Sequence, residues 1–247
     1  MLERFRLDGR VALVTGASRN IGAAISRGLA EAGAELILNA RTAAPLEALA
    51  GELRAAGARV ATVAADLSLA DDRARLIDAA GGRVDVLVNN ATGGGRPARS
   101  LETTPAQWRD ALEVNVAAPF ELSRAVVPGM QARGRGAIVN VLSTAAFVVV
   151  PPMLAYAAMK SALWTMTRYL ARECAPAVRV NAVCPGTVQE GGALKVPSWA
   201  ALLPQTALGR VGEPDEVAAA VLYLACDASS YTTGEVVFVD GGRVLAG

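Results

Sequence analysis

The chain has 247 residues, of which 53% are hydrophobic and 4% aromatic, and its 24 basic and 23 acidic side chains leave a formal net charge of +1. This length suits one large α/β domain, and the near-neutral charge offers no footprint for nucleic acid or an anionic membrane. The chain contains no histidine, so any proton transfer must use another side chain.

Strand and helix patterns alternate along the chain. Because the strands are near-continuous apolar runs, they indicate a parallel sheet covered on both faces. The predicted fold class is α/β: a doubly wound Rossmann fold with a seven-stranded parallel sheet flanked by helices, in one domain over residues 1–247. The expected strands are 10–16, 34–40, 58–66, 84–91, 136–143, 178–186 and 234–242, and the expected helices are 17–33, 44–57, 68–82, 104–134, 151–175 and 213–227.

The chain start and the cysteines predict a cytoplasmic protein. The N-terminal MLERFRLDGRVALVTG lacks the apolar segment and cleavage site of a signal peptide. The most apolar later stretch, residues 145–159, is interrupted by Pro151 and Pro152 and is too short to span a bilayer. Cys174, Cys184 and Cys226 are scattered, which indicates buried free thiols and neither a disulfide framework nor a metal site.

The segment TGASRNIG, residues 15–22, joins the first expected strand to the first expected helix. Gly16 allows a tight turn, and Gly22 lets the helix pack close to the strand. The helix N-terminus then presents backbone N–H groups to a pyrophosphate. Glycine also ends strands for purely structural reasons, but this position in a parallel α/β chain favours a dinucleotide site.

The segment LAYAAMK, residues 154–160, puts Tyr156 four residues before Lys160, so both side chains share one helix face. Alone, such a pair is ordinary on a helix surface. A nearby ammonium favours the phenolate, however, and we therefore expect the pKa of Tyr156 to lie below its usual value of about 10. Only Lys160 and Lys195 among the 24 basic residues are lysine, which suggests that Lys160 performs a task unsuited to a guanidinium.

Several short motifs occur together in the chain, at spacings that match those of a known protein family. They are Gly16-x-x-x-Asn20-x-Gly22, NNA at 89–91, Asn115 in EVNV, Ser143 thirteen residues before Tyr156, Tyr156-x-x-x-Lys160, and PG at 185–186. Over residues 8–242 the chain resembles the short-chain dehydrogenase/reductase family, including 3-oxoacyl-carrier-protein reductases and hydroxysteroid dehydrogenases. It departs at Asn20, which replaces the middle glycine but tolerates unusual backbone angles. It departs again at Thr92, which replaces the glycine of NNAG; we expect Thr92 to reshape the substrate side.

The resemblance implies a role for each matched residue. Tyr156 is the general acid in reduction and the base in the reverse direction, and Ser143 hydrogen-bonds the same substrate oxygen. Lys160 binds the nicotinamide ribose, Asn115 completes a proton relay through water, and the cofactor supplies hydride. The implied cofactor-binding residues are Gly16, Ser18, Arg19, Asn20, Ile21, Gly22, Arg41, Asp66, Leu67, Asn89, Ala91, Tyr156, Lys160, Pro185, Gly186, Thr187 and Val188.

The residues after the second expected strand bear on cofactor choice. An acidic residue there would select NAD, but the chain has Ala40 followed by Arg41. With Arg19 in the glycine-rich turn, two guanidinium groups could bind a 2′-phosphate. Either arginine could instead be a solvated residue of an arginine-rich chain. We predict NADP(H) as the cofactor.

Three segments, 92–97, 143–152 and 187–204, are expected to form the substrate walls, the last as a mobile lid. The predicted pocket residues are Gly93, Ala145, Val150 and Met153. The stretch 145–153 is apolar and has no cation for a carboxylate, so it favours a neutral, fairly hydrophobic carbonyl compound. Alternatively, several of its valines belong to the core or to subunit contacts.

The predicted function is an NADPH-dependent carbonyl reductase that is reversible as a secondary-alcohol dehydrogenase. Two alternatives stay open: an NAD-linked alcohol, steroid or sugar dehydrogenase, and a non-catalytic dinucleotide-binding scaffold. The expected helices 104–134 and 151–175 carry apolar residues on more than one face, among them Phe120, Trp164, Met166 and Tyr169. Together with the resemblance, they imply a homotetramer.

Overall fold

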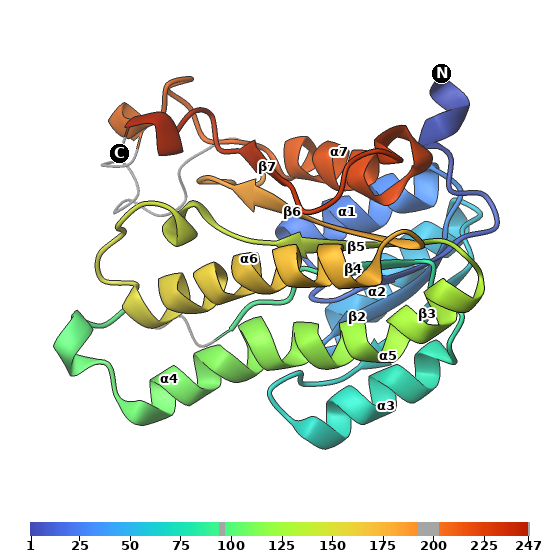
Figure 1. Ribbon diagram of the computed structural model, residues 1–247, viewed down its shortest axis with the longest axis horizontal. Helices are drawn as coiled ribbons and strands as arrows, with labels where there is room; N and C mark the ends of the chain where they lie inside the picture. Colours follow the sequence, from blue (N-terminus) through green and yellow to red (C-terminus); the bar gives the residue numbers. More distant parts are fainter. Residues whose placement is uncertain (94–96, 192–202, 247) are drawn as a thin grey trace.

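Seven strands form one parallel sheet in the computed structural model, which describes residues 1–93, 97–191 and 203–246 (Figure 1). Their order is β3-β2-β1-β4-β5-β6-β7, and every neighbouring pair is parallel. The order reverses between β1 and β4, where the carboxyl ends of the strands leave a crevice for ligands. The strands are β1 (Val11–Val14), β2 (Glu35–Ala40), β3 (Val60–Ala64), β4 (Val86–Asn89), β5 (Gly136–Val141), β6 (Val178–Pro185) and β7 (Val236–Val239).

Helices cover both faces of the sheet, which confirms the predicted fold class (Figure 1). Successive strand residues point to opposite faces: Ala12 and Val14 pack in the core beneath α1, α2 and α7, whereas Val11 and Leu13 pack in the core beneath α3, α5 and α6. The helices are α1 (Asn20–Glu31), α2 (Ala43–Ala55), α3 (Ala70–Ala80), α4 (Pro105–Leu112), α5 (Ala118–Ala132), α6 (Leu154–Cys174) and α7 (Pro214–Ala225), with short 3-10 turns η1 (Leu2–Phe5), η2 (Ser100–Glu102), η4 (Thr144–Ala146), η6 (Asp227–Ser229) and η7 (Val244–Ala246).

The helix predicted over 104–134 is interrupted. Between α4 and α5 the backbone forms one π-helical turn, η3 (Glu113–Ala117), in which the N–H of Ala118 donates to the carbonyl oxygen of Glu113, five residues earlier. Pro119 explains the change, because proline has no N–H to donate to the carbonyl of Asn115 four residues before it. The helix predicted over 151–175 is also shorter, since α6 begins at Leu154 after a turn.

All three cysteines are buried and free, as predicted. Of the helices in the described ranges, none is long and apolar enough to cross a membrane. The same residues contain no cluster of three or more side chains suited to hold a metal ion.

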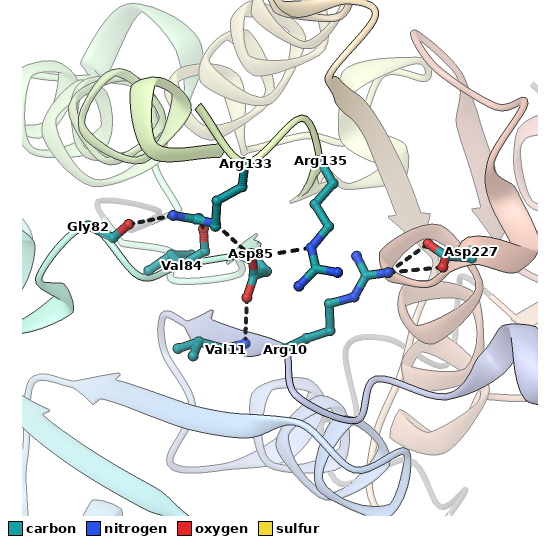
Figure 2. A network of polar contacts seen from close by, with 8 residues as sticks. All are labelled: Arg10, Val11, Gly82, Val84, Asp85, Arg133, Arg135 and Asp227. Atoms are coloured by element: carbon teal, nitrogen blue, oxygen red, sulfur yellow. Dashed lines mark hydrogen bonds and ion pairs between the residues drawn. The ribbon is translucent and has the colours of Figure 1, made fainter. Parts of the chain in front are cut away.

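A buried carboxylate joins several elements at the amino-terminal edge of the sheet, opposite the glycine-rich turn (Figure 2). Asp85, whose side chain is 6% exposed, pairs with Arg133 at 3.0 Å and with Arg135 at 3.9 Å. It also accepts a hydrogen bond from the N–H of Val11 (3.0 Å). Arg133 donates in addition to two carbonyl oxygens in the turn before β4. Asp85 therefore holds β1, β4 and the turn before β5 together.

Replacing Asp85 with alanine is expected to lower the free energy of unfolding by about 3 kcal/mol, because Arg133 and the N–H of Val11 both lose a buried partner. The matched control is Asp227→Ala at the same edge. The Asp227 side chain is 59% exposed and pairs with Arg10 at 2.9 Å, so its loss should cost at most about 1 kcal/mol. Denaturant unfolding measures both values, and equal losses in the two variants would contradict the role given to Asp85.

Candidate active site

The glycine-rich turn after β1 packs tightly against the end of β4. Gly16 has a φ of +63°, and a Cβ on it would lie 2.8 Å from the Cα of Ala91. A Cβ on Gly22 would lie 2.1 Å from the carbonyl oxygen of Gly16. Asn20 has a φ of +49° and is the one non-glycine residue with positive φ in the part of the chain described. Asparagine thus adopts the left-handed conformation that the usual middle glycine allows.

Asn90, which was not among the predicted site residues, fixes this turn. Its Nδ2 donates to the carbonyl oxygens of Thr15 (2.9 Å) and Gly16 (3.1 Å). The hydroxyl of Thr15 in return accepts from the backbone N–H groups of Asn90 and Ala91, both at 3.0 Å. A polar residue directly after a buried strand, beside a turn whose backbone groups need partners, was the available signal.

The start of α1 fits the phosphates of a dinucleotide. No side chain caps its N-terminus, so its first N–H groups remain suited to an anion. The N–H of Ala17 donates to the carbonyl oxygen of Asn39 (2.8 Å), which joins the turn to β2 just before Arg41. Arg19 and Arg41 are both exposed. Across residues 1–93, 97–191 and 203–246 neither forms an ion pair, whereas Arg27 on the same helix pairs with Glu52.

Three of the predicted cofactor-binding residues lie after β3 and at the end of β4. Asp66 is half-buried, and its Oδ1 accepts from both the N–H (3.0 Å) and the hydroxyl (2.8 Å) of Ser68, while Leu67 is buried. Asn89 is buried, and its Nδ2 donates to Asn140 Oδ1 (2.8 Å). Among the described residues its Oδ1 is the only buried side-chain nitrogen or oxygen without a partner. The side-chain amide of Asn89 therefore lies in the core at the end of β4.

Ser143, Tyr156 and Lys160 meet at the carboxyl end of β5. Lys160 is 2% exposed; its Nζ donates to the carbonyl oxygen of Val141 (2.8 Å) and lies 5.7 Å from the centroid of the Tyr156 ring. Burial lowers the pKa of Lys160 to about 8. Ser143 lies two residues after the end of β5, and its Oγ accepts from the N–H of Ala145 (3.2 Å) at the start of η4. Because Ser143 Oγ accepts in this bond, its hydroxyl can still donate a hydrogen bond to another group.

The protein groups alone raise the pKa of Tyr156, contrary to our expectation of a lowered value. Burial is the main cause, because it disfavours the phenolate, and the nearby hydroxyls of Ser143 and Thr92 only oppose it. Lys160 does not reverse the shift, since its ammonium lies over the ring face and is hydrogen-bonded to the Val141 carbonyl. The i,i+4 spacing brought the two side chains together but did not fix which atom of the ring the ammonium approaches.

Asn115 lies in the π-helical turn, and its side chain is fully buried. Its Nδ2 donates to the carbonyl oxygens of Gly93 and Ala111, both at 2.8 Å, while its Oδ1 accepts from the hydroxyl of Thr92 (2.8 Å). These bonds hold the segment after β4 against the helix. Because Pro119 has no N–H, the backbone carbonyl of Asn115 lacks its regular helical partner and suits a hydrogen bond from water.

The structure brings two of the predicted substrate walls together. The N–H of Ala98 donates to the carbonyl oxygen of Pro152 (3.0 Å), which joins the segment after β4 to the one before α6. Gly93 packs against Val114, where a Cβ would lie 3.2 Å from a methyl group. Of the other predicted pocket residues, Ala145 is buried and Val150 and Met153 are half-buried. Positions 94–96, and positions 192–202 of the predicted lid, lie outside the described residues.

The segment after β6 borders a cavity of about 470 Å³. Pro185 ends β6, and a Cβ on Gly186 would lie 2.8 Å from the Cα of Asp240, so the two segments touch there. Thr187 and Val188 line the cavity together with residues from 206–216 and 238–245. Two of the predicted cofactor-binding residues, Thr187 and Val188, therefore face a cavity that a ligand could enter.

Known proteins resemble this chain over nearly its whole length. The family model described as "Enoyl-(Acyl carrier protein) reductase" matches residues 16–243. Galactitol 2-dehydrogenase (L-tagatose-forming) of Cereibacter sphaeroides is 46% identical, with 98% of this chain and 97% of that protein covered. The 3-oxoacyl-[acyl-carrier-protein] reductase FabG of Thermotoga maritima is 36% identical, with 97% and 100% covered.

Among solved structures, a gluconate 5-dehydrogenase from Burkholderia cenocepacia J2315 in complex with NADP and tartrate superimposes with a TM-score of 0.91. It is 34% identical, and the match covers 99% of this chain and 98% of that one. The identity and coverage of these relatives leave one assignment. The chain belongs to the short-chain dehydrogenase/reductase family and is an oxidoreductase that acts on alcohol or keto groups.

Proposed function

We propose that this protein is an NADPH-dependent carbonyl reductase that reduces a neutral, fairly hydrophobic ketone and, in reverse, oxidises a secondary alcohol. The observation that carries the proposal is the convergence of Ser143, Tyr156 and Lys160 at the end of β5. The two exposed arginines at the other end of the dinucleotide site, Arg19 and Arg41, support the choice of NADP(H).

The cofactor assignment rests on charge. Arg19 and Arg41 lie on neighbouring segments, joined by the bond between the N–H of Ala17 and the carbonyl of Asn39, and can bind a 2′-phosphate by charge-assisted hydrogen bonds. Ala40 leaves no carboxylate for the ribose hydroxyls that distinguish NAD. Solved relatives with NADP bound include the gluconate 5-dehydrogenase and a 3-oxoacyl (acyl-carrier-protein) reductase from Agrobacterium tumefaciens C58.

In the proposed reaction NADPH, when bound, supplies the hydride. The Ser143 hydroxyl donates a hydrogen bond to the substrate oxygen, and the Tyr156 phenol gives that oxygen a proton. Burial favours the neutral phenol, which is the form required for reduction. Lys160, with a pKa of about 8, is charged at neutral pH and can pass a proton toward the phenol. A water held by the Asn115 carbonyl links Lys160 to solvent.

The substrate assignment rests on the apolar wall from Ala145 to Met153, which contains no cation. A second candidate is a sugar-alcohol dehydrogenase, favoured by the 46% identity to galactitol 2-dehydrogenase across 98% of this chain. The two candidate functions use the same catalytic residues, Ser143, Tyr156 and Lys160. They differ only in how polar the substrate pocket must be.

A homotetramer in the cytoplasm is part of the proposal. Trp108, Phe120 and Tyr169 are large, exposed side chains on α4, α5 and α6. A partner subunit would bury them, and sedimentation equilibrium reports the number of subunits.

The test follows consumption of NADPH, and of NADH in parallel, over aliphatic, aryl, 3-oxo-ester and steroid ketones. Galactitol and gluconate are run as substrates for oxidation with NADP⁺ and NAD⁺. We expect reduction of a neutral ketone with kcat/KM about 100-fold higher for NADPH than for NADH. A preference for NADH would contradict the cofactor assignment, and tight binding without turnover of any compound would favour a scaffold. Faster turnover of galactitol than of every ketone would favour the second candidate.

A further inference from the structure

Thr92 places a hydroxyl between two residues of the proton path. It stands where the family's usual NNAG motif has glycine, and it is exposed. Its Oγ1 donates to Asn115 Oδ1 at 2.8 Å. The same hydroxyl is near enough to the Tyr156 phenol to favour the phenolate. A glycine at this position would offer neither contact.

The orientation of the Asn115 amide fixes where the Thr92 proton points. Nδ2 of Asn115 donates to the carbonyl oxygens of Gly93 and Ala111, both at 2.8 Å, and a carbonyl oxygen only accepts. Oδ1 must therefore face Thr92, and the single hydroxyl proton of Thr92 fills that bond. The proton cannot serve the Tyr156 oxygen at the same time, so Thr92 has two alternative acceptors.

We propose that Thr92 is a positioning residue whose hydroxyl rotates between these two acceptors. It points to Asn115 Oδ1 while Tyr156 is a neutral phenol, and it turns to the Tyr156 oxygen once that oxygen has lost its proton. The phenolate is then the stronger acceptor because it is charged. No covalent bond forms or breaks at Thr92. The inference rests on the proposed function, in which Tyr156 exchanges a proton with the substrate.

The other groups that face the phenol leave room for this contribution. Ser143, at the end of β5, is engaged with the substrate oxygen in the proposed reaction. Lys160, on α6, lies over the face of the ring and donates to a backbone carbonyl. The thiol of Cys184, on β6, gives the phenolate no stabilisation. Of the two hydroxyls that interact with the phenol in the described part of the chain, Thr92 is the one that can donate to the phenolate when substrate is bound.

The test compares Thr92→Val, which keeps the shape but removes the hydroxyl, with Thr92→Ser, which keeps the hydroxyl. Alcohol oxidation requires the phenolate, so kcat/KM rises with pH until Tyr156 has ionised. In Thr92→Val we expect this acid limb to move to higher pH by about half a unit. Thr92→Ser should retain the wild-type limb, and both variants should keep the wild-type KM for NADP⁺.

A second readout needs neither cofactor nor turnover. Ultraviolet difference absorbance follows ionisation of the Tyr156 phenol, with the Tyr156→Phe protein subtracted as the blank. The same upward shift is expected in Thr92→Val, and Thr92→Gly supplies a second variant without the hydroxyl if the valine protein fails to fold.

The role of Thr92 would be overturned if the pKa of Tyr156 stayed the same or fell in Thr92→Val. It would also be overturned if that pKa rose equally in Thr92→Ser. If Tyr156→Phe still oxidises alcohols, the proposed function fails instead, and the absorbance titration still decides whether Thr92 stabilises the phenolate.

Discussion

Replacing Tyr156 with phenylalanine is expected to lower kcat for ketone reduction by about 1,000-fold. The ring and its packing remain, but the substrate oxygen loses its proton donor, and the chain has no histidine to replace it. Because the phenol acts in the chemical step, the KM for NADPH should stay within about twofold of the wild-type value. Steady-state kinetics measure both constants, and NADPH fluorescence measures binding directly.

Tyr169→Phe is the matched control on the same helix. Its side chain is 67% exposed, and loss of its hydroxyl should leave kcat unchanged. A Tyr156→Phe enzyme that keeps more than about a tenth of the wild-type kcat would mean that another group, or water, protonates the substrate.

Replacing Arg19 and Arg41 together with alanine is expected to raise the KM for NADPH by about 100-fold while leaving the KM for NADH unchanged. Each guanidinium would make a charge-assisted bond to the 2′-phosphate, and exposure to solvent reduces what each bond contributes. The effect should shrink as ionic strength rises, since salt screens exposed charges.

Arg27→Ala on α1 controls for the loss of positive charge near the turn. Arg27 pairs with Glu52 at 2.7 Å, so its removal should hardly change the KM for NADPH. A double variant that weakens NADPH and NADH equally would show that the two arginines support the turn and do not select the phosphate.

The fold could be predicted from the sequence because one physical pattern repeats in every strand. A strand such as VALV in β1 buries side chains on both faces, and only a sheet between two helical layers allows this. Edge strand β3 departs from the pattern, since part of it is exposed. The π-helical turn was not predicted, because apolar spacing reports the face of a helix and is insensitive to one extra residue within a turn.

The candidate site was predicted in its residue types and less well in its energetics. Motif spacing identified Tyr156 and Lys160, but the pKa of Tyr156 depends on how deeply the fold buries the phenol, and no spacing reveals that. Asn90 was missed as a site residue, and Thr92 was predicted only as part of a substrate wall, for a related reason. Their partners, Gly16 and Asn115, are more than twenty residues away in the sequence, and only the topology brings them together.

The π-helical turn between α4 and α5 makes the length of this segment as important as the identity of Asn115. Deleting one residue within 113–117 would remove the extra residue of the turn, and everything before the deletion would rotate by about 100° relative to everything after it. Trp108 on α4 and Leu122 on α5 could then not both keep their present neighbours, because they lie on opposite sides of the deletion. In homologues and in engineered libraries, this helix should therefore accept many substitutions but neither insertions nor deletions, which gives the alignment of such proteins a fixed point at Asn115.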